Sequence, residues 1–329
     1  MPLFEPTQAS FWAGRLPDGA VLHLVRTADP RSQALEAFAA DLGAALPRLA
    51  VQRRRDEEAV WPWLEAGDTG VRLSLVPDGP KLDVLMGLLA GDDAARSLPA
   101  ARQRRLEAVT APAALSLYVA PGCPYCPRAL AEWSSLAARC APLRLAVLDA
   151  GLFPEAAREA GVAAVPTLRL DDAWRWSGDI PVDDVLELLG GRDPAALGAA
   201  ALEGLIKDGR ALDLGRLMAA HGRIFPAFVD LLTHAKWPVR LGAMVAAEEL
   251  QERSPDLARR LAEDLRGRFD NLDAAAQGDA LHVIGEVGGP EQLAFADRLA
   301  ALHDTAPSEL QEAARDAATR LRARHPGAK

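Results

Sequence analysis

The hydrophobic pattern of this chain changes after Gly190-Gly191 and Pro194, and this change limits the folds that the chain can adopt. Before it, short β-type runs alternate with stretches of amphipathic helical spacing, and after it only helical spacing remains. A chain of 329 residues is long enough for two to three domains. The pattern therefore predicts an α/β region followed by an all-α region.

The first hundred residues contain predicted strands and helices in alternation. Short or alternating apolar runs predict strands, and apolar residues three or four positions apart predict helices. The predicted strands are residues 20–25, 49–53 and 71–76, and the predicted helices are residues 31–46 and 82–90. Trp61-Pro62-Trp63 lies between these elements, where we expect the aromatic side chains to anchor a loop.

A second block repeats this plan with clearer elements. Its predicted strands are residues 115–119, 143–148, 167–170 and 173–176, and its predicted helices are residues 126–139, 154–160 and 182–189. The repeated element order suggests a tandem duplication, although the two halves share almost no identical residues. A polar helical connection over residues 91–113 joins the halves. We therefore expect domains at residues 1–105, 106–191 and 192–329.

The region after Pro194 contains three stretches that superpose on one another. They begin at Val239, Ala276 and Leu310, at offsets of 37 and 34 residues, and carry small or apolar side chains at shared positions. This spacing fits paired-helix repeats that stack into a short solenoid, because small side chains let neighbouring helices approach closely. The sequence from Trp237 resembles the second helix of HEAT-type repeats, which implies an α-solenoid that contacts other proteins.

The sharpest motif is Gly122-Cys123-Pro124-Tyr125-Cys126, which lies between a predicted strand and a predicted helix. A thiolate in the first turn of a helix faces unpaired backbone N–H groups and the positive end of the helix dipole, which lower its pKa. With two residues between the sulfurs, the second thiol can attack a mixed disulfide formed by the first. The motif predicts thiol–disulfide exchange, with Cys123 as the attacking thiolate and Cys126 as the resolving thiol.

Three other interpretations of this pair are a zinc site, two inert core cysteines and a structural disulfide. Zinc needs four ligands, and residues 111–190 contain no histidine and no second cysteine pair. The flanking Pro and Gly residues argue against an inert pair, and a reducing cytoplasm disfavours a structural disulfide. We therefore favour redox exchange and expect no metal. Cys140, at the end of a predicted helix, is expected to be a buried, inert thiol.

Val165-Pro166 precedes a predicted strand and follows the cysteine pair in the chain. Together, the two motifs make residues 115–189 resemble the thioredoxin superfamily, in which a cis proline lies opposite the cysteines. The resemblance implies a cis bond before Pro166, which would expose the Val165 backbone for strand-like pairing with a substrate peptide. The alternative is an ordinary trans proline that opens a strand. Pro124 and Tyr125, between the cysteines, are further candidates for substrate contact.

The Cys-Pro-Tyr-Cys string also resembles glutaredoxins, but two of their features are missing. Ala120 stands where glutaredoxins place a basic residue, and Ser177-Gly178-Asp179 replaces their glutathione-binding Gly-Gly turn. We therefore do not expect glutathione to be the main reductant. Leu117 stands where thioredoxins carry a buried Asp, so proton transfer would need water or Cys126 itself.

The run CPRAL at residues 126–130, together with Val165-Pro166, resembles the N-terminal region of the flavoprotein subunit of alkyl hydroperoxide reductase. Tandem protein disulfide oxidoreductases are similar in the same way. Both families fuse two thioredoxin folds, and in the first family the first fold has no CxxC. Here too, Thr27-Ala28-Asp29-Pro30 occupies the place of a CxxC, so the first half is expected to wall the active-site groove, bind a partner or give structural support.

The expected fold is a tandem thioredoxin-like α/β region followed by an all-α HEAT-like solenoid. The helical region stands where the flavoprotein family carries its flavin and nicotinamide module, so the resemblance implies electrons from a separate reductase, a flavoprotein. We expect a thiol–disulfide oxidoreductase that acts on protein disulfides, needs no cofactor and binds a partner on its helical repeats. The alternative is an interaction protein whose dithiol is a redox sensor.

Charge and hydropathy exclude two classes of partner. The chain has 37 Lys and Arg against 46 Asp and Glu, a net charge of −9, which argues against a general nucleic-acid binder. Charged residues interrupt every long apolar stretch, so we expect no membrane span. The first twenty residues lack the pattern of a secretory signal, and we expect a cytoplasmic protein.

Overall fold

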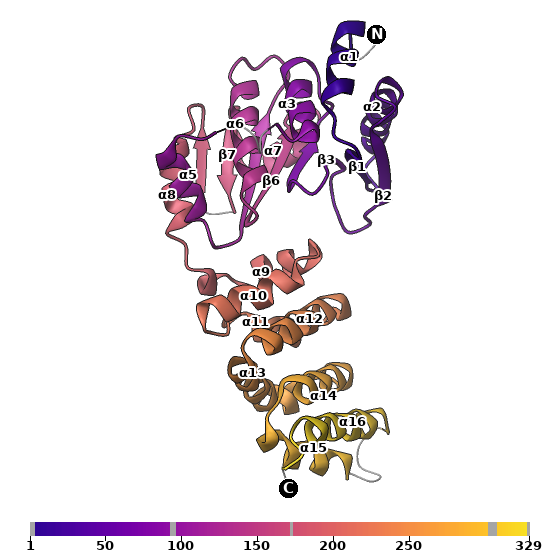
Figure 1. Cartoon of the computed structure of the whole chain (residues 1–329), viewed down its shortest axis with the longest axis vertical. Helices are drawn as coiled ribbons and strands as arrows, with labels where there is room; N and C mark the ends of the chain where they lie inside the picture. The colour runs from indigo at the N-terminus through magenta and orange to yellow at the C-terminus, as the bar shows by residue number, and fades with distance from the viewer. Residues whose placement is uncertain (1–3, 93–96, 172–173, 302–307, 328–329) are drawn as a thin grey trace. The chain divides into compact units, whose positions relative to one another are not determined.

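The computed structural model describes residues 4–92, 97–171, 174–301 and 308–327, and the chain divides into two compact units (Figure 1). The first unit is Met1–Arg192 and the second is Asp193–Lys329. Strands occur in the first unit, and the described part of the second contains helices. The predicted fold class, a mixed sheet with flanking helices followed by a helical region, is confirmed.

The first unit is built on one eight-stranded sheet in the order β2-β1-β3-β4-β6-β5-β7-β8. Within each half, two strands pair in parallel and two more add in antiparallel fashion. The halves meet where β4 pairs with β6 in parallel, with Leu73 opposite Val147. The strands are β1 (Val21–Arg26), β2 (Ala50–Arg55), β3 (Trp63–Ala66), β4 (Val71–Ser74), β5 (Ala113–Val119), β6 (Leu143–Asp149), β7 (Thr167–Leu170) and β8 (Trp174–Ser177).

Helices flank this sheet and bury its apolar side chains. On α6, Leu130, Trp133 and Leu136 are each at most 1% exposed and belong to a core shared by both halves. That core extends into α3 through Leu85 and Met86, since α3 packs against α6. The helices are α1 (Pro6–Arg15), α2 (Ser32–Ala45), α3 (Gly79–Ala90), α5 (Ala100–Glu107), α6 (Cys126–Arg139), α7 (Pro154–Glu159) and α8 (Val182–Gly190).

Two elements of the first unit differ from the sequence expectation. Trp63, expected in a loop, begins strand β3, pairs with Val25 of β1 and is only 6% exposed. The strand is four residues long and contains the charged Glu65, so its apolar pattern is too short to predict a strand. Helix α1 was not predicted either, although Glu5 and Gln8 form a capping box at its start. Ala173, where the last strand was expected to begin, lies outside the described residues.

The second unit consists of helices that stack in sequence. The three predicted stretches lie on α12, α14 and α16, and α14 packs against both of the others. Their small residues Ala246, Ala280 and Ala317 are at most 1% exposed. The helices are α9 (Ala199–Lys207), α10 (Ala211–His221), α11 (Phe228–Leu232), α12 (Trp237–Arg253), α13 (Pro255–Arg268), α14 (Ala274–Val287), α15 (Leu293–Ala300) and α16 (Ser308–Arg324).

None of the described helices combines the length and the apolar composition that are needed to span a bilayer.

Candidate functional site

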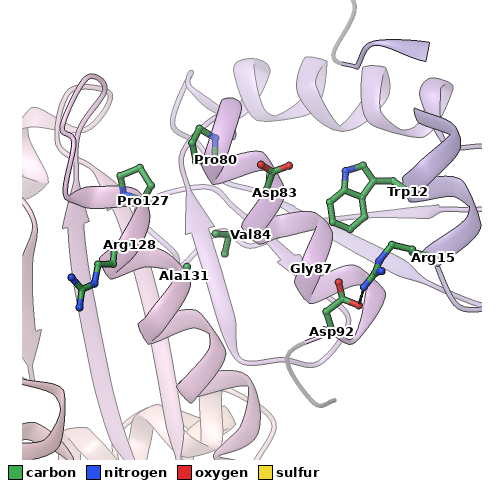
Figure 2. Close-up of a pocket in the computed structure, with 10 residues that line it drawn as sticks. All are labelled: Trp12, Arg15, Pro80, Asp83, Val84, Gly87, Asp92, Pro127, Arg128 and Ala131. Atoms are coloured by element: carbon green, nitrogen blue, oxygen red, sulfur yellow. Dashed lines mark hydrogen bonds and ion pairs between the residues drawn. The ribbon is translucent and has the colours of Figure 1, made fainter. Parts of the chain in front are cut away.

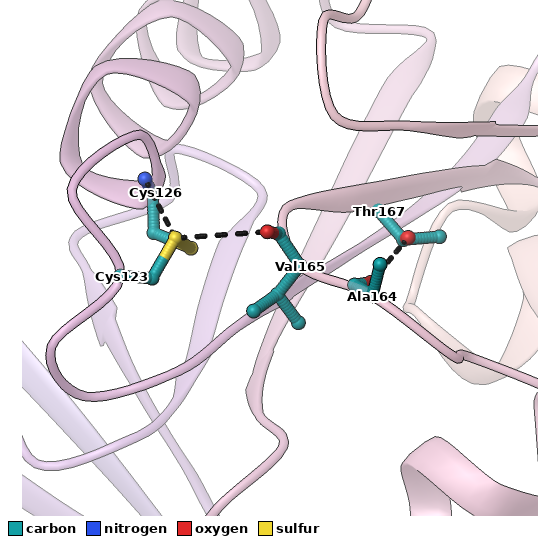
Figure 3. Close-up of a disulfide and its surroundings, with 5 residues drawn as sticks. All are labelled: Cys123, Cys126, Ala164, Val165 and Thr167. Carbon is teal, nitrogen blue, oxygen red and sulfur yellow. Dashed lines mark hydrogen bonds between the residues drawn. A yellow bond between two sulfur atoms is a disulfide. The ribbon is translucent and has the colours of Figure 1, made fainter.

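Cys123 and Cys126 lie where strand β5 gives way to helix α6, and they form a disulfide (Figure 3). The chain turns at Gly122, whose φ of +73° is a conformation that glycine adopts without strain. Pro127 occupies the first turn of α6, where its missing N–H leaves no helical bond unmade. These local features bring the two Cα atoms to 5.5 Å.

The two cysteines differ in their exposure. Cys126 is only 1% exposed, whereas Cys123 is half-buried and Pro124 and Tyr125 beside it are exposed. The backbone N–H of Cys126 donates to Cys123 Sγ at 3.2 Å. The N-terminal end of α6 therefore points a donor at the outer sulfur, and Cys123 is the sulfur that a partner molecule can reach.

The segment before strand β7 lies next to the outer sulfur. The peptide bond between Val165 and Pro166 is cis, as predicted, and Cys123 Sγ lies 3.7 Å from the carbonyl oxygen of Val165. The hydroxyl of Thr167 donates to the carbonyl of Ala164 at 2.7 Å (Figure 3). It also contacts Ser177 Oγ at 2.7 Å. These bonds fix the Val165 segment to β8.

The structure thus brings four of the six predicted site residues together: both cysteines, Val165 and Pro166. Pro166 is buried and Val165 is half-buried. The other two residues, Pro124 and Tyr125, project from the same loop, and Tyr125 is 72% exposed.

A cavity of about 500 Å³ opens beside these residues, with Tyr125 and Pro166 among its lining side chains. Arg102 also lines it and is held by Glu132 (3.0 Å) and by Asp183 (3.2 Å). The hydrogen bond from Arg102 lowers the pKa of Asp183 below its usual range. Arg102 lies in the segment expected to be a polar connection between the halves, and no local sequence pattern marks it as a site residue.

A larger cavity of about 750 Å³ lies on another side of helix α6 (Figure 2). Trp12 of α1, Val84 of α3 and Arg128 of α6 line it, and an ion pair between Arg15 and Asp92 (2.5 Å) closes one end. Arg128 lines this cavity and the smaller one, so the two cavities lie on either side of the start of α6. Trp12 and Arg15 of α1, a helix that the sequence pattern does not predict, form one wall of this cavity.

Cys140 lies outside the disulfide at the end of α6, and its side chain is buried as expected. Its thiol points toward the carbonyl oxygen of Leu106 at 3.8 Å. Among the described residues, no group of three or more His, Cys, Asp or Glu side chains is arranged to hold a metal ion.

The segment that carries the disulfide is similar to a known family. Residues 115–189 match the family model described as the thioredoxin domain. A search of curated proteins found no significant match.

Several solved structures are similar to part of this chain. The NTD_N/C domain of alkylhydroperoxide reductase AhpF from Enterococcus faecalis is 18% identical, with a TM-score of 0.49 over 56% of this chain and 99% of that chain. A protein disulfide oxidoreductase from Aeropyrum pernix is 14% identical, with a TM-score of 0.46 over 56% of this chain and 92% of that chain. The match to the family model and the fold agree, so the chain contains a thioredoxin-like domain, with Cys123 and Cys126 at the start of its α6 helix.

Proposed function

We propose that this protein is a thiol–disulfide oxidoreductase that reduces or exchanges the disulfides of other proteins through Cys123 and Cys126. The observation that carries the proposal is the unequal exposure of the pair: Cys123 is half-buried beside Val165, whereas Cys126 is 1% exposed. An outer sulfur can meet a bulky substrate, and an inner sulfur can attack only what the outer one has captured. The arrangement supports a two-step exchange with fixed roles.

The exchange starts from the dithiol form. The Cys123 thiolate attacks one sulfur of a substrate disulfide, so that a Cys123–substrate bond forms and the second substrate sulfur leaves as a thiolate and takes a proton from water. Cys126 then loses its proton to water and attacks Cys123 Sγ, so that the Cys123–substrate bond breaks and the first substrate sulfur leaves as a thiolate, which takes a proton from water. Two electrons pass to the substrate, and the product is the Cys123–Cys126 disulfide present in the structure.

The start of α6 supports the role of Cys123 as the attacking group. The N–H of Cys126 points at Cys123 Sγ from 3.2 Å, and a donor in this position favours a negative charge on the sulfur. The positive end of the α6 dipole acts in the same direction.

The substrate chain would lie over Val165 and Pro166. The Val165 carbonyl lies 3.7 Å from Cys123 Sγ, close enough for a peptide paired with this backbone to bring its own sulfur to the thiolate. Pro124 and Tyr125 are both exposed and would also contact the substrate, since Tyr125 lines the same cavity as Pro166.

The electrons would come from a separate dithiol reductase, and the resemblance to the flavoprotein family favours a flavoprotein. The helical unit would bind a protein partner, in the manner of HEAT-type repeats. The protein would work in the cytoplasm, where a reductase keeps the pair in its dithiol form.

The test is steady-state turnover on a model peptide disulfide, with a flavoprotein dithiol reductase as electron source. The full chain should turn over many times, and Cys123→Ser should lose at least about 100-fold in rate, because it removes the nucleophile. The Cys126→Ser variant should accumulate a mixed disulfide with the peptide, since no internal thiol can release it. Cys140→Ser, which removes a buried thiol outside the disulfide, is the matched control and should keep the wild-type rate.

A single stoichiometric reaction without turnover would overturn the enzyme proposal. It would favour the alternative, an interaction protein in which the dithiol is a redox sensor.

A further inference from the structure

The loop after β1 occupies the same place in the first half that the cysteine loop after β5 occupies in the second. Both strands pair in parallel with one neighbour and antiparallel with the other. The first loop carries Thr27-Ala28-Asp29-Pro30-Arg31 in place of cysteines. Its last residue, Arg31, reaches out of its own half and contacts the loop that follows β6.

We propose that Arg31 is a positioning residue for the active site: it holds residues 150–155, which form the loop after β6 and the start of α7, and thereby fixes the two segments, around Pro121 and Val165, that present Cys123 to a substrate. The inference rests on the proposed oxidoreductase function and assigns the cysteine-free first half a part in it.

The guanidinium of Arg31 makes directed contacts with both halves. It donates from Nε to Asp29 at 2.8 Å and from Nη1 to the carbonyl of Leu152 at 2.8 Å, and it pairs with Glu155 of α7. Its carbon centre also lies 4.3 Å from the ring centroid of Phe153. The side chain is only 21% exposed. A planar group with several fixed donors can meet these partners at once, which a lysine cannot do.

The first path to the active site runs through Asp149. Its buried carboxylate accepts the N–H groups of Gly151 (2.8 Å) and Leu152 (3.2 Å), and so ties the loop to the end of β6. Gly151 packs closely against Pro121, because a Cβ at this position would lie 3.3 Å from the proline Cδ. Pro121 lies two residues before Cys123, so the loop held by Arg31 packs against the start of the cysteine loop.

The second path runs through a small apolar cluster. Phe153 is fully buried in it, and Trp61 and Val165 pack against the same cluster. The Trp61 and Phe153 rings are 5.4 Å apart, and Arg31 lies over both of them. The cluster therefore connects Arg31 to the residue whose carbonyl oxygen is 3.7 Å from Cys123 Sγ.

Removal of the guanidinium should make the Val165 segment, which binds the substrate, less well fixed. It should not change the reactivity of the Cys123 thiolate. The reactivity of Cys123 depends on the N–H donor at the start of α6, whereas substrate docking depends on the Val165 segment. The inference therefore predicts a rise in KM for a peptide disulfide and an unchanged rate of attack on a small reagent.

The experiment compares two variants of the full chain, Arg31→Met and Arg240→Met. Arg240 is the matched control, because its guanidinium likewise donates to a carboxylate, Asp279 (2.6 Å), and to a backbone carbonyl, that of His234 (2.8 Å), but in the helical unit. For each variant, unfolding curves establish the folded fraction. KM and kcat are then measured with the model peptide disulfide, and the alkylation rate of reduced Cys123 is measured with iodoacetamide as a function of pH.

Arg31→Met should raise KM about five- to tenfold, with kcat and the alkylation profile within about twofold of wild type, whereas Arg240→Met should leave all three unchanged. An unchanged KM in folded Arg31→Met, or an equal rise in Arg240→Met, would overturn the inference. If Arg31→Met does not fold, the inference is tested with Arg31→Lys. Lysine keeps the positive charge but lacks the planar guanidinium with its several N–H donors, so this variant should raise KM about threefold. An active wild type with an unaffected variant refutes only this inference, whereas an inactive wild type refutes the proposed function as well.

Discussion

The sulfur of Cys123 lies 3.7 Å from the carbonyl oxygen of Val165, although 42 residues separate the two in the chain. The pairing of β5 with β7 produces this proximity. The two strands are antiparallel, with Tyr118 opposite Thr167, so the end of β5 and the start of β7 lie at the same edge of the sheet. The cysteine loop leaves from that edge and the Val165 segment arrives at it.

The first prediction concerns which sulfur reacts. When the reduced protein is treated with limiting iodoacetamide near neutral pH, Cys123 should be modified at least about tenfold faster than Cys126, because only exposed thiolates react readily. The structure gives the reason, since Cys126 is 1% exposed and Cys123 is half-buried. Peptide mapping of the alkylated protein measures the ratio, with buried Cys140 as an internal control. Preferential labelling of Cys126 would reverse the proposed roles.

The site was predictable from the sequence where its signals are local. The CxxC at a strand-to-helix boundary and the proline before the next strand are each visible in a short window, and the structure places them side by side. Helix α6 begins at Cys126 and ends at Arg139, as predicted, because its amphipathic spacing is regular and Pro127 marks its first turn.

The contacts of Arg31 were not predictable in the same way. Its partner Leu152 is 121 residues away, and no spacing rule connects the two positions. The strand β3 was missed for a related reason, since four residues that include Glu65 have no readable period and take their strand conformation from pairing with β1 and β4. The periodicity of a sequence shows which face of a helix or strand is buried. It does not show which distant element packs against that face.

The second prediction concerns pH. The hydrogen bond from Arg31 lowers the pKa of Asp29, and another lowers the pKa of Glu155. A carboxyl whose pKa is lower in the folded state than in the unfolded state stabilises the fold when the pH is above its unfolded-state pKa. This stabilisation is lost as the pH falls through its folded-state pKa. The difference in unfolding free energy between wild type and Arg31→Met should therefore be full at about pH 7 and shrink below about pH 4. Urea unfolding at several pH values tests this, and a difference that does not vary with pH would contradict it.

A third prediction uses two glycines of α14. A Cβ on Gly285 would lie 2.9 Å from the backbone Cα of Ala317 on α16, whereas a Cβ on Gly278 would meet nothing within 4 Å. Gly285→Ala should cost about 1–3 kcal/mol, because the backbones of two packed helices must move apart. Gly278→Ala should stabilise the same helix by about 0.5–1 kcal/mol, because alanine loses less conformational entropy.

Urea unfolding curves of both variants, monitored by circular dichroism, measure these opposite changes in the free energy of unfolding. Since the two positions share one helix, their comparison separates packing against α16 from helix propensity. Equal shifts in the two variants would mean that the close approach of α14 to α16 does not limit this position.

The last prediction concerns the division of labour between the two units. Both cysteines of the disulfide, Val165 and the cavity beside Tyr125 belong to the first unit, which ends at Arg192. This unit has a core of its own, shared by its two halves and separate from that of the helical unit. A fragment of residues 1–192 should therefore fold, and it should reduce a small model disulfide within about twofold of the full-chain rate. Its reaction with the physiological client should be slower, because docking on the helical unit is lost. Turnover with both substrates and a thermal unfolding curve for the fragment measure these effects. If the folded fragment lost its activity on the small disulfide, the helical unit would have to contribute to the active site itself.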